Sequence, residues 1–83
     1  MKIETIDEQE EYRLVRCGDR YAVVEVRDGH VLSLHRHDRR EGKDTQKGLA
    51  EVIGEDGWTS EDSARNGFRA LVEEEVHWAE IIW

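Results

Sequence analysis

Residues 59–83 of the chain read TSEDSARNGFRALVEEEVHWAEIIW, and we expect the rest of the fold to be arranged around this stretch. Its apolar side chains recur at spacings of three and four residues, which places them on one stripe of a helix: Ala64, Phe68, Leu71, Val72, Val76, Ala79 and Ile82. This pattern predicts a C-terminal amphipathic helix that buries the stripe against another layer of the protein.

The start of this helix is marked more clearly than its end. Thr59 or Ser60 can cap the free amides, and Glu61 and Asp62 place negative charge at the positive end of the helix dipole. No turn residue interrupts the remaining sequence, so we expect the helix to continue to the last residue. The alternative makes residues 76–83 a strand, because Val, Trp and Ile favour strands.

Residues 11–36 contain three runs that favour strands, EYRLVRC, RYAVVEV and HVLSLHR. The pairs Gly18-Asp19 and Asp28-Gly29 separate these runs, and both are signals for two-residue hairpin turns because glycine accepts a positive φ. The sequence therefore predicts a three-stranded antiparallel sheet. The register that follows from two-residue turns pairs Tyr12 with Glu25, Leu14 with Val23, Arg16 with Tyr21, Val23 with Leu34, Glu25 with Leu32 and Val26 with Val31.

This register sorts the side chains of the sheet onto two faces. The bulkier face holds Tyr12, Leu14, Tyr21, Val23, Leu32 and Leu34, and we expect the C-terminal helix to cover it. The other face is smaller but also apolar, whereas an antiparallel sheet with one free face usually alternates apolar and polar residues. Either another part of the chain covers this second face, or it is an oligomer interface formed by Val15, Val24, Val26 and Val31.

The remaining segments complete a single small α+β domain with the order β-β-β-α-α. Residues 1–10 read as an acidic lead-in or an edge strand, and residues 37–43 as a polar loop. The sequence of residues 44–54 predicts a short helix that ends at Gly54, because glycine suits the left-handed position that follows a helix. Trp58, just before the second helix, is expected to pack back onto that helix.

The single cysteine, Cys17, excludes an internal disulfide and a thiolate zinc cage. No run approaches the length of a membrane helix, and the N-terminus does not resemble a signal peptide. We therefore expect a cytoplasmic protein, of a bacterium or of an infected host, that does not act at a membrane.

Chemistry-bearing residues are few, and none forms an established motif. His35, His37 and Asp38 are weak candidates for a zinc or nickel site, because residues two apart on an extended strand share a face. Cys17 has arginines beside it but no base placed next to it by the sequence. We expect neither a cofactor nor an enzymatic activity.

The net charge of −8 is unevenly distributed along the chain. Residues 1–11 carry five acids against one lysine, and residues 48–83 carry nine acids against two arginines. Residues 12–47 are mildly basic, with nine Lys and Arg against six acids. This distribution disfavours direct binding to nucleic acid, which needs a concentrated cationic surface, and favours a protein partner with a basic surface.

In size and charge, the chain resembles phage-encoded inhibitors such as anti-CRISPR proteins, a resemblance of type that carries no residue across. It implies a small inhibitor or decoy that mimics DNA and occupies a basic nucleic-acid-binding surface of its target. The residues expected to contact the partner are Glu8, Glu10, Glu11, Glu55, Asp56, Glu61, Asp62, Glu73, Glu74, Glu75 and Trp83. The alternatives are a homodimeric accessory domain joined through its second sheet face and a small histidine-based metal-binding protein.

Overall fold

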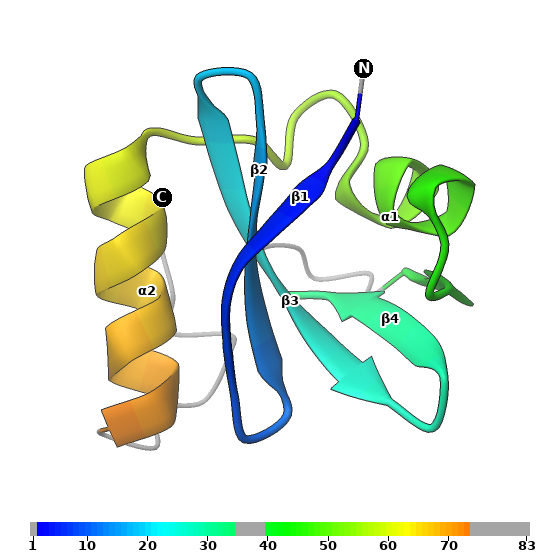
Figure 1. Cartoon of the computed structure of the whole chain (residues 1–83), viewed down its shortest axis with the longest axis horizontal. Helices are drawn as coiled ribbons and strands as arrows, with labels where there is room; N and C mark the ends of the chain where they lie inside the picture. The colour runs from blue at the N-terminus through cyan, green and yellow to red at the C-terminus, as the bar shows by residue number, and fades with distance from the viewer. Residues whose placement is uncertain (1, 35–39, 74–83) are drawn as a thin grey trace.

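The computed structural model describes residues 2–34 and 40–73, which form an antiparallel sheet and two helices (Figure 1). The sheet has five strands in sequential order rather than the three predicted. The elements are β1 (Glu4–Gln9), β2 (Tyr12–Cys17), β3 (Arg20–Arg27), β4 (His30–Ser33), β5 (Glu41–Lys43), α1 (Gln46–Ile53) and α2 (Glu61–Glu73).

The two predicted hairpins are present with the predicted register. Gly18 has a φ of 64°, while Asp28 and Gly29 have φ values of 51° and 78°, so both turns use the positive φ that tight hairpins require. The pairs on each side of β3 agree with two-residue turns: Tyr12 with Glu25, Leu14 with Val23, Arg16 with Tyr21, Glu25 with Leu32 and Val26 with Val31. Leu34 lies just beyond β4 and packs in the same cluster as Val23.

β1 makes the N-terminal segment an edge strand of the sheet rather than a lead-in. It pairs antiparallel with β2 through a turn at Glu10 and Glu11, with an irregularity in register between Thr5 and Asp7. Glu10 holds a φ of 57°, a conformation that costs an L-residue about 1–2 kcal/mol. The turn contains no glycine, asparagine or aspartate, which explains why the sequence pattern did not reveal this hairpin.

A polar loop was predicted over residues 37–43, but Glu41–Lys43 forms the strand β5, which pairs with β4. Residues 35–39 lie outside the described part of the chain. Gly42 and Gly48 allow α1 to lie directly on this short strand. A Cβ on Gly48 would come within 1.8 Å of the Lys43 carbonyl oxygen, so only glycine permits this approach.

α2 covers the bulkier face of the sheet, as predicted. The side chains that form this cluster are Leu14, Tyr21, Val23, Leu34, Ala64, Phe68 and Leu71, and the partly buried Val72 packs against them. Each large apolar side chain buried here contributes about 1.5–3 kcal/mol to the hydrophobic stabilisation. Ser60 caps α2, since its Oγ accepts a hydrogen bond of 3.2 Å from the Ser63 amide. The predicted continuation beyond residue 73, as helix or strand, lies outside the described residues.

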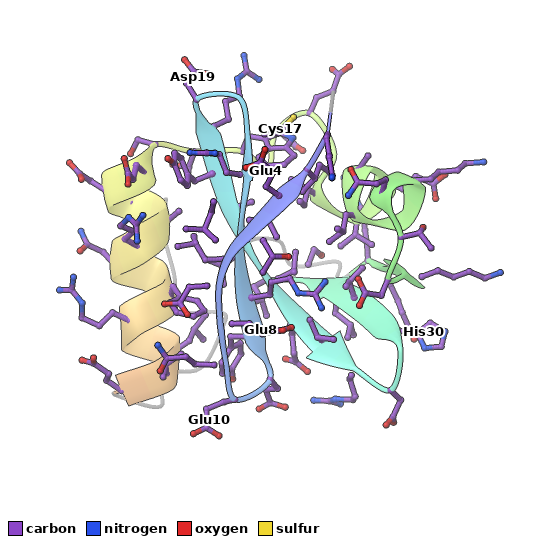
Figure 2. The ribbon with its side chains drawn as sticks, viewed as in Figure 1. Glu4, Glu8, Glu10, Cys17, Asp19 and His30 are labelled. Atoms are coloured by element: carbon purple, nitrogen blue, oxygen red, sulfur yellow. The ribbon has the colours of Figure 1, made fainter. Side chains whose placement is uncertain are left out.

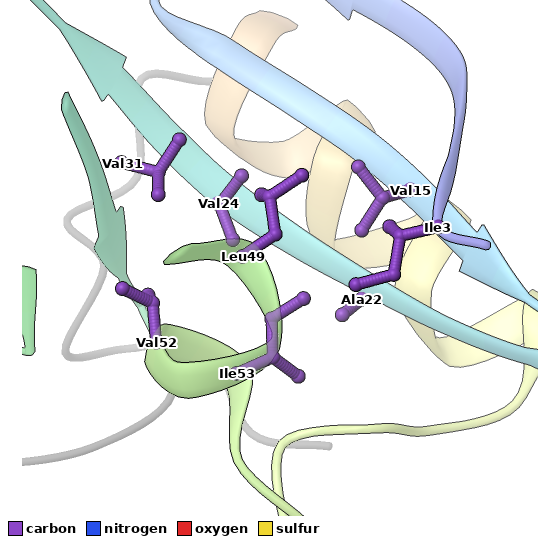
Figure 3. Close-up of a cluster of buried hydrophobic side chains, with 8 residues drawn as sticks. All are labelled: Ile3, Val15, Ala22, Val24, Val31, Leu49, Val52 and Ile53. Atoms are coloured by element: carbon purple, nitrogen blue, oxygen red, sulfur yellow. The ribbon is translucent and has the colours of Figure 1, made fainter. Parts of the chain in front are cut away.

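α1 covers the second face of the sheet, within the stretch 44–54 where a short helix was expected (Figure 3). The buried cluster between them consists of Ile3, Val15, Ala22, Val24, Val31, Leu49, Val52 and Ile53. Of the four valines assigned to an oligomer interface, Val15, Val24 and Val31 are at most 1% exposed, and Val26 is half-buried. Three of these valines are therefore core residues of this chain, and α1 occupies the place that a second copy would have taken.

Trp58 packs against this second cluster and not, as expected, against α2. The cause is the extended backbone of the connection between the helices. Thr59 exchanges two backbone hydrogen bonds of 2.8 Å with Tyr21, at the start of β3. Because neighbouring residues in an extended segment point to opposite faces, the pairing of Thr59 with Tyr21 turns Trp58 towards the α1 side.

Candidate interaction surface

Three of the four arginines in the sheet, Arg13, Arg16 and Arg27, form ion pairs with carboxylates of the protein. Arg13 donates from its two terminal nitrogens to Asp44, at 2.7 and 3.1 Å, and from Nε to Glu8 at 2.9 Å. Its side chain is only 13% exposed. The hydrogen bonds with Asp44 raise the pKa of Arg13, and the same bonds lower the pKa of Asp44 below its ordinary value of 3.8. This group ties β1 and β2 to the segment that leads into α1.

Three further arginines are paired in the same way. Arg16 binds Glu4 at 2.7 Å, and Arg65 binds Glu61 at 2.8 Å one helical turn away. Arg27 pairs with the buried Glu25 and lies 3.9 Å from Glu11. The two exposed pairs, Arg16–Glu4 and Arg65–Glu61, contribute little to stability. Together with Arg13, the arginines of these ion pairs are four of the ten Lys and Arg side chains in the described residues. The carboxylates without such partners therefore dominate the field around the protein.

One end of the molecule gathers several exposed carboxylates. The turn between β2 and β3, the connection from α1 to α2 and the first turn of α2 all lie at this end (Figure 1). We name the acidic residues there the acidic end: Asp19, Glu55, Asp56, Glu61 and Asp62. Asp19, Glu55 and Asp62 make no ion pair with any described residue, and Figure 2 shows Asp19 at the tip of its hairpin. Asp19 was not among the residues predicted to contact a partner.

The opposite end carries the predicted contact residues Glu8, Glu10, Glu11 and Glu73, but its charges are mixed. Glu10 lies at the tip of the β1–β2 hairpin (Figure 2), while Glu8 and Glu11 pair with arginines. A cavity of about 190 Å³ opens here over the apolar residues Leu14, Phe68 and Val72. Its charged lining consists of Asp7, Arg65, Arg69 and Glu73. Two carboxylates and two guanidinium groups line this cavity, so this end is not uniformly acidic.

A larger groove lies beside the acidic end, with a volume of about 630 Å³. It is lined by Ile3, Cys17, Arg20, Ala50, Gly54, Glu55 and Trp58. Ile3 belongs to the core, while Cys17 and Trp58 are partly buried against it, so the floor is apolar and fixed by packing. The Ile3 amide donates a hydrogen bond of 2.7 Å to Oε1 of Gln46, and Nε2 of Gln46 donates one of 2.9 Å to the Ile3 carbonyl. These bonds hold the start of the chain against α1.

Several predicted site residues lie outside the described part of the chain. These are the three candidate metal ligands, His35, His37 and Asp38, and three predicted contact residues, Glu74, Glu75 and Trp83. Within residues 2–34 and 40–73, no group of three or more His, Cys, Asp and Glu side chains is arranged to hold a metal ion. In the same ranges, no helix has the length and apolar character needed to cross a membrane.

Comparison of the chain with protein-family models, with curated proteins and with solved structures finds no match. The function is therefore inferred from the geometry and charge of the chain itself. The sequence pattern missed the groove, because its residues come from the segment before β1, from β2, β3 and α1, and from the helix connection. Only the fold brings these separate positions together.

Proposed function

We propose that this protein is a small non-enzymatic inhibitor or decoy that binds the basic, nucleic-acid-binding surface of another protein. The acidic end is its contact surface. The observation that carries this proposal is the concentration of exposed carboxylates there, with Asp19, Glu55 and Asp62 free of ion pairs among the described residues. A basic cleft that normally holds phosphates attracts such carboxylates by the same long-range electrostatics.

The internal pairing of arginines supports this role. Arg13, Arg16 and Arg27 hold carboxylates of their own sheet, so they do not offer a cationic stripe to a nucleic acid. Three arginines lie near the five carboxylates of the acidic end: Arg20 at the base of the Asp19 turn, Arg40, whose guanidinium lies beside Gly54, and Arg65, which is bound by Glu61. The surface is therefore suited to a cationic protein and poorly suited to a phosphate backbone.

The rigidity of the acidic end also supports the proposal. The helix connection is pinned to β3 by the two hydrogen bonds between Thr59 and Tyr21, and Ser60 fixes the first turn of α2. Carboxylates held on a fixed backbone lose less conformational entropy on binding than carboxylates on a mobile tail. A preorganised acidic surface can therefore compete with nucleic acid for a basic cleft.

The test is affinity capture with the full chain as bait, followed by elution with duplex DNA. We expect the captured protein to be a nucleic-acid-binding protein that DNA displaces, and binding to weaken as salt screens the charges. The double charge reversal Glu55→Lys and Asp62→Lys should lower the affinity for this protein at least about tenfold, equivalent to about 1.4 kcal/mol.

The matched control reverses two exposed acids away from the acidic end, Glu10→Lys and Glu41→Lys, with the same change in net charge. This control should keep most of the affinity, and circular dichroism should show that both variants are folded. Equal binding by both double variants, or a partner that DNA does not displace, would contradict the proposal.

A further inference from the structure

The groove beside the acidic end has the properties of a site for a side chain of a partner. Its volume of about 630 Å³ lies within the range of protein sites that hold small molecules or large side chains. Its floor is apolar, because Ile3, Cys17 and Trp58 are packed against the core. Water in such a groove is readily displaced by an apolar group, which gains the free energy of burying that surface.

Trp58 occupies a position typical of an interface anchor. Its ring is partly buried against the α1 cluster, and its backbone precedes the Thr59 pairing with Tyr21. The indole is therefore held in place by packing below and by hydrogen bonds beside it, while part of its surface remains in the groove. Tryptophan held in this way is enriched among residues that dominate binding energy at protein interfaces.

The charges around the groove indicate which kind of segment would enter it. Glu55 is exposed, lines the groove and belongs to the acidic end, whose other members lie on the helix connection, the first turn of α2 and the β2–β3 turn. Arg20 also lines the groove, and the guanidinium of Arg40 lies beside Gly54, so a basic segment would have to keep its cations away from both. A segment in which a basic residue stands beside an apolar one fits these charges. Its basic residue can pair with Glu55 while its apolar side chain enters the groove.

We infer that the groove receives an apolar side chain, preferably aromatic, from a basic segment of the partner protein, with the neighbouring Lys or Arg on Glu55. This inference rests on the proposed function and specifies the partner's contact chemistry. The aromatic ring packs on Trp58 and Ile3, while the acidic end holds the flanking cations. Aromatic pairs of this kind contribute beyond the area that they bury.

Cys17 provides a direct readout of whether the groove is occupied. It is the only cysteine of the chain, and its side chain lines the groove. The test measures alkylation of the full chain by iodoacetamide, a neutral reagent, by mass spectrometry. The probe is a synthetic peptide with the sequence Lys-Arg-Phe-Arg-Lys. At a concentration of about twice its Kd, one third of the thiols stay uncovered, so alkylation should slow about threefold.

Two further peptides separate the parts of the inference. The peptide Lys-Arg-Gly-Arg-Lys should leave the alkylation rate unchanged, because it brings charge without an apolar group. The peptide Glu-Asp-Phe-Asp-Glu should also fail, because the acidic end repels it. If the basic aromatic peptide does not slow alkylation, or if Cys17 of the free protein does not react, the inference is wrong.

Variants of the protein give an independent check. Ala50 is an exposed residue of α1 that lines the groove, so Ala50→Phe should fill it and remove the protection by the basic aromatic peptide. Asn66→Phe adds the same side chain on the exposed side of α2, with no change in charge, and should leave the protection intact. Protection that survives Ala50→Phe would place the peptide elsewhere.

Calorimetry with the same peptides distinguishes failure of this inference from failure of the proposed function. If both basic peptides bind equally and Cys17 is not protected, the groove is not the site, while the acidic end still binds cations. If neither basic peptide binds and the affinity capture yields no DNA-displaceable protein, the proposed function itself is contradicted.

Discussion

The ion pair between Arg13 and Asp44 should stabilise the fold measurably at neutral pH. The two bonds of 2.7 and 3.1 Å join a nearly buried guanidinium, 13% exposed, to a carboxylate whose side chain is 31% exposed. Exposed ion pairs contribute up to about 1 kcal/mol, and hydrogen bonds to charged groups about 1.5–3 kcal/mol. For this half-buried bidentate pair we expect a coupling free energy of about 1–2 kcal/mol.

The assay is a double-mutant cycle with Arg13→Met, which keeps the aliphatic stem, and Asp44→Asn, which keeps the shape of the side chain. The free energy of unfolding of the four proteins is measured by urea denaturation at neutral pH. A coupling below about 0.3 kcal/mol would refute the argument, because this lies within the error of additivity for independent sites.

The same pair predicts how stability depends on pH. Arg13 lowers the pKa of Asp44 in the folded protein below its ordinary value of 3.8. A carboxylate with a depressed folded pKa stabilises the protein fully above its unfolded pKa, and this stabilisation is lost as pH falls through the folded pKa. The stability difference between the wild type and Asp44→Asn should therefore be constant above about pH 5 and shrink below about pH 3.8. A difference that grows on acidification would contradict this assignment.

Three further substitutions test the packing and the backbone. Glu10→Gly should be about 1 kcal/mol more stable than Glu10→Ala in urea unfolding, because only glycine adopts a φ of 57° without strain. Equal stability of the two variants would contradict strain at this position. Gly48→Ala should lower the free energy of unfolding by about 2–3 kcal/mol, because the added methyl group clashes with the Lys43 carbonyl. The control Gly18→Ala, which meets no neighbouring atom, should cost about 1 kcal/mol. If Gly18→Ala melts at the lower temperature, α1 does not approach β5 as closely as described. Val24→Lys should unfold the monomer in circular dichroism, since Val24 is 1% exposed beneath α1, and a folded variant would place Val24 at a surface.

The parts of the fold predicted from sequence are those with strong local signals. Glycine at position 18 and Asp-Gly at 28–29 defined both hairpins, and the two-residue turns then set the register of β2, β3 and β4. The stripe through Phe68 and Leu71 correctly placed α2 on the bulkier face. These features depend on neighbours a few residues apart, which sequence periodicity captures.

The parts that were missed depend on contacts between distant segments. β1 was left open between a lead-in and an edge strand, because its turn runs through two glutamates that give no hairpin signal. β5 was missed because it is three residues long and has no large apolar side chain. The second sheet face was recognised as apolar, but only the packing of α1 shows that the chain covers it itself. The groove depends on the extended pairing of Thr59 with Tyr21, which turns Trp58 away from α2. Such pairing over 38 positions leaves no local pattern.

We propose that a cationic partner binds at the acidic end and its groove. The most direct measurement is an NMR titration of the ¹⁵N-labelled full chain with the peptide Lys-Arg-Phe-Arg-Lys, following every backbone amide. We expect the largest shifts on the β2–β3 turn and on residues 54–62, together with the indole of Trp58. Shifts concentrated instead around Glu10 and Glu73, at the opposite end, would contradict it.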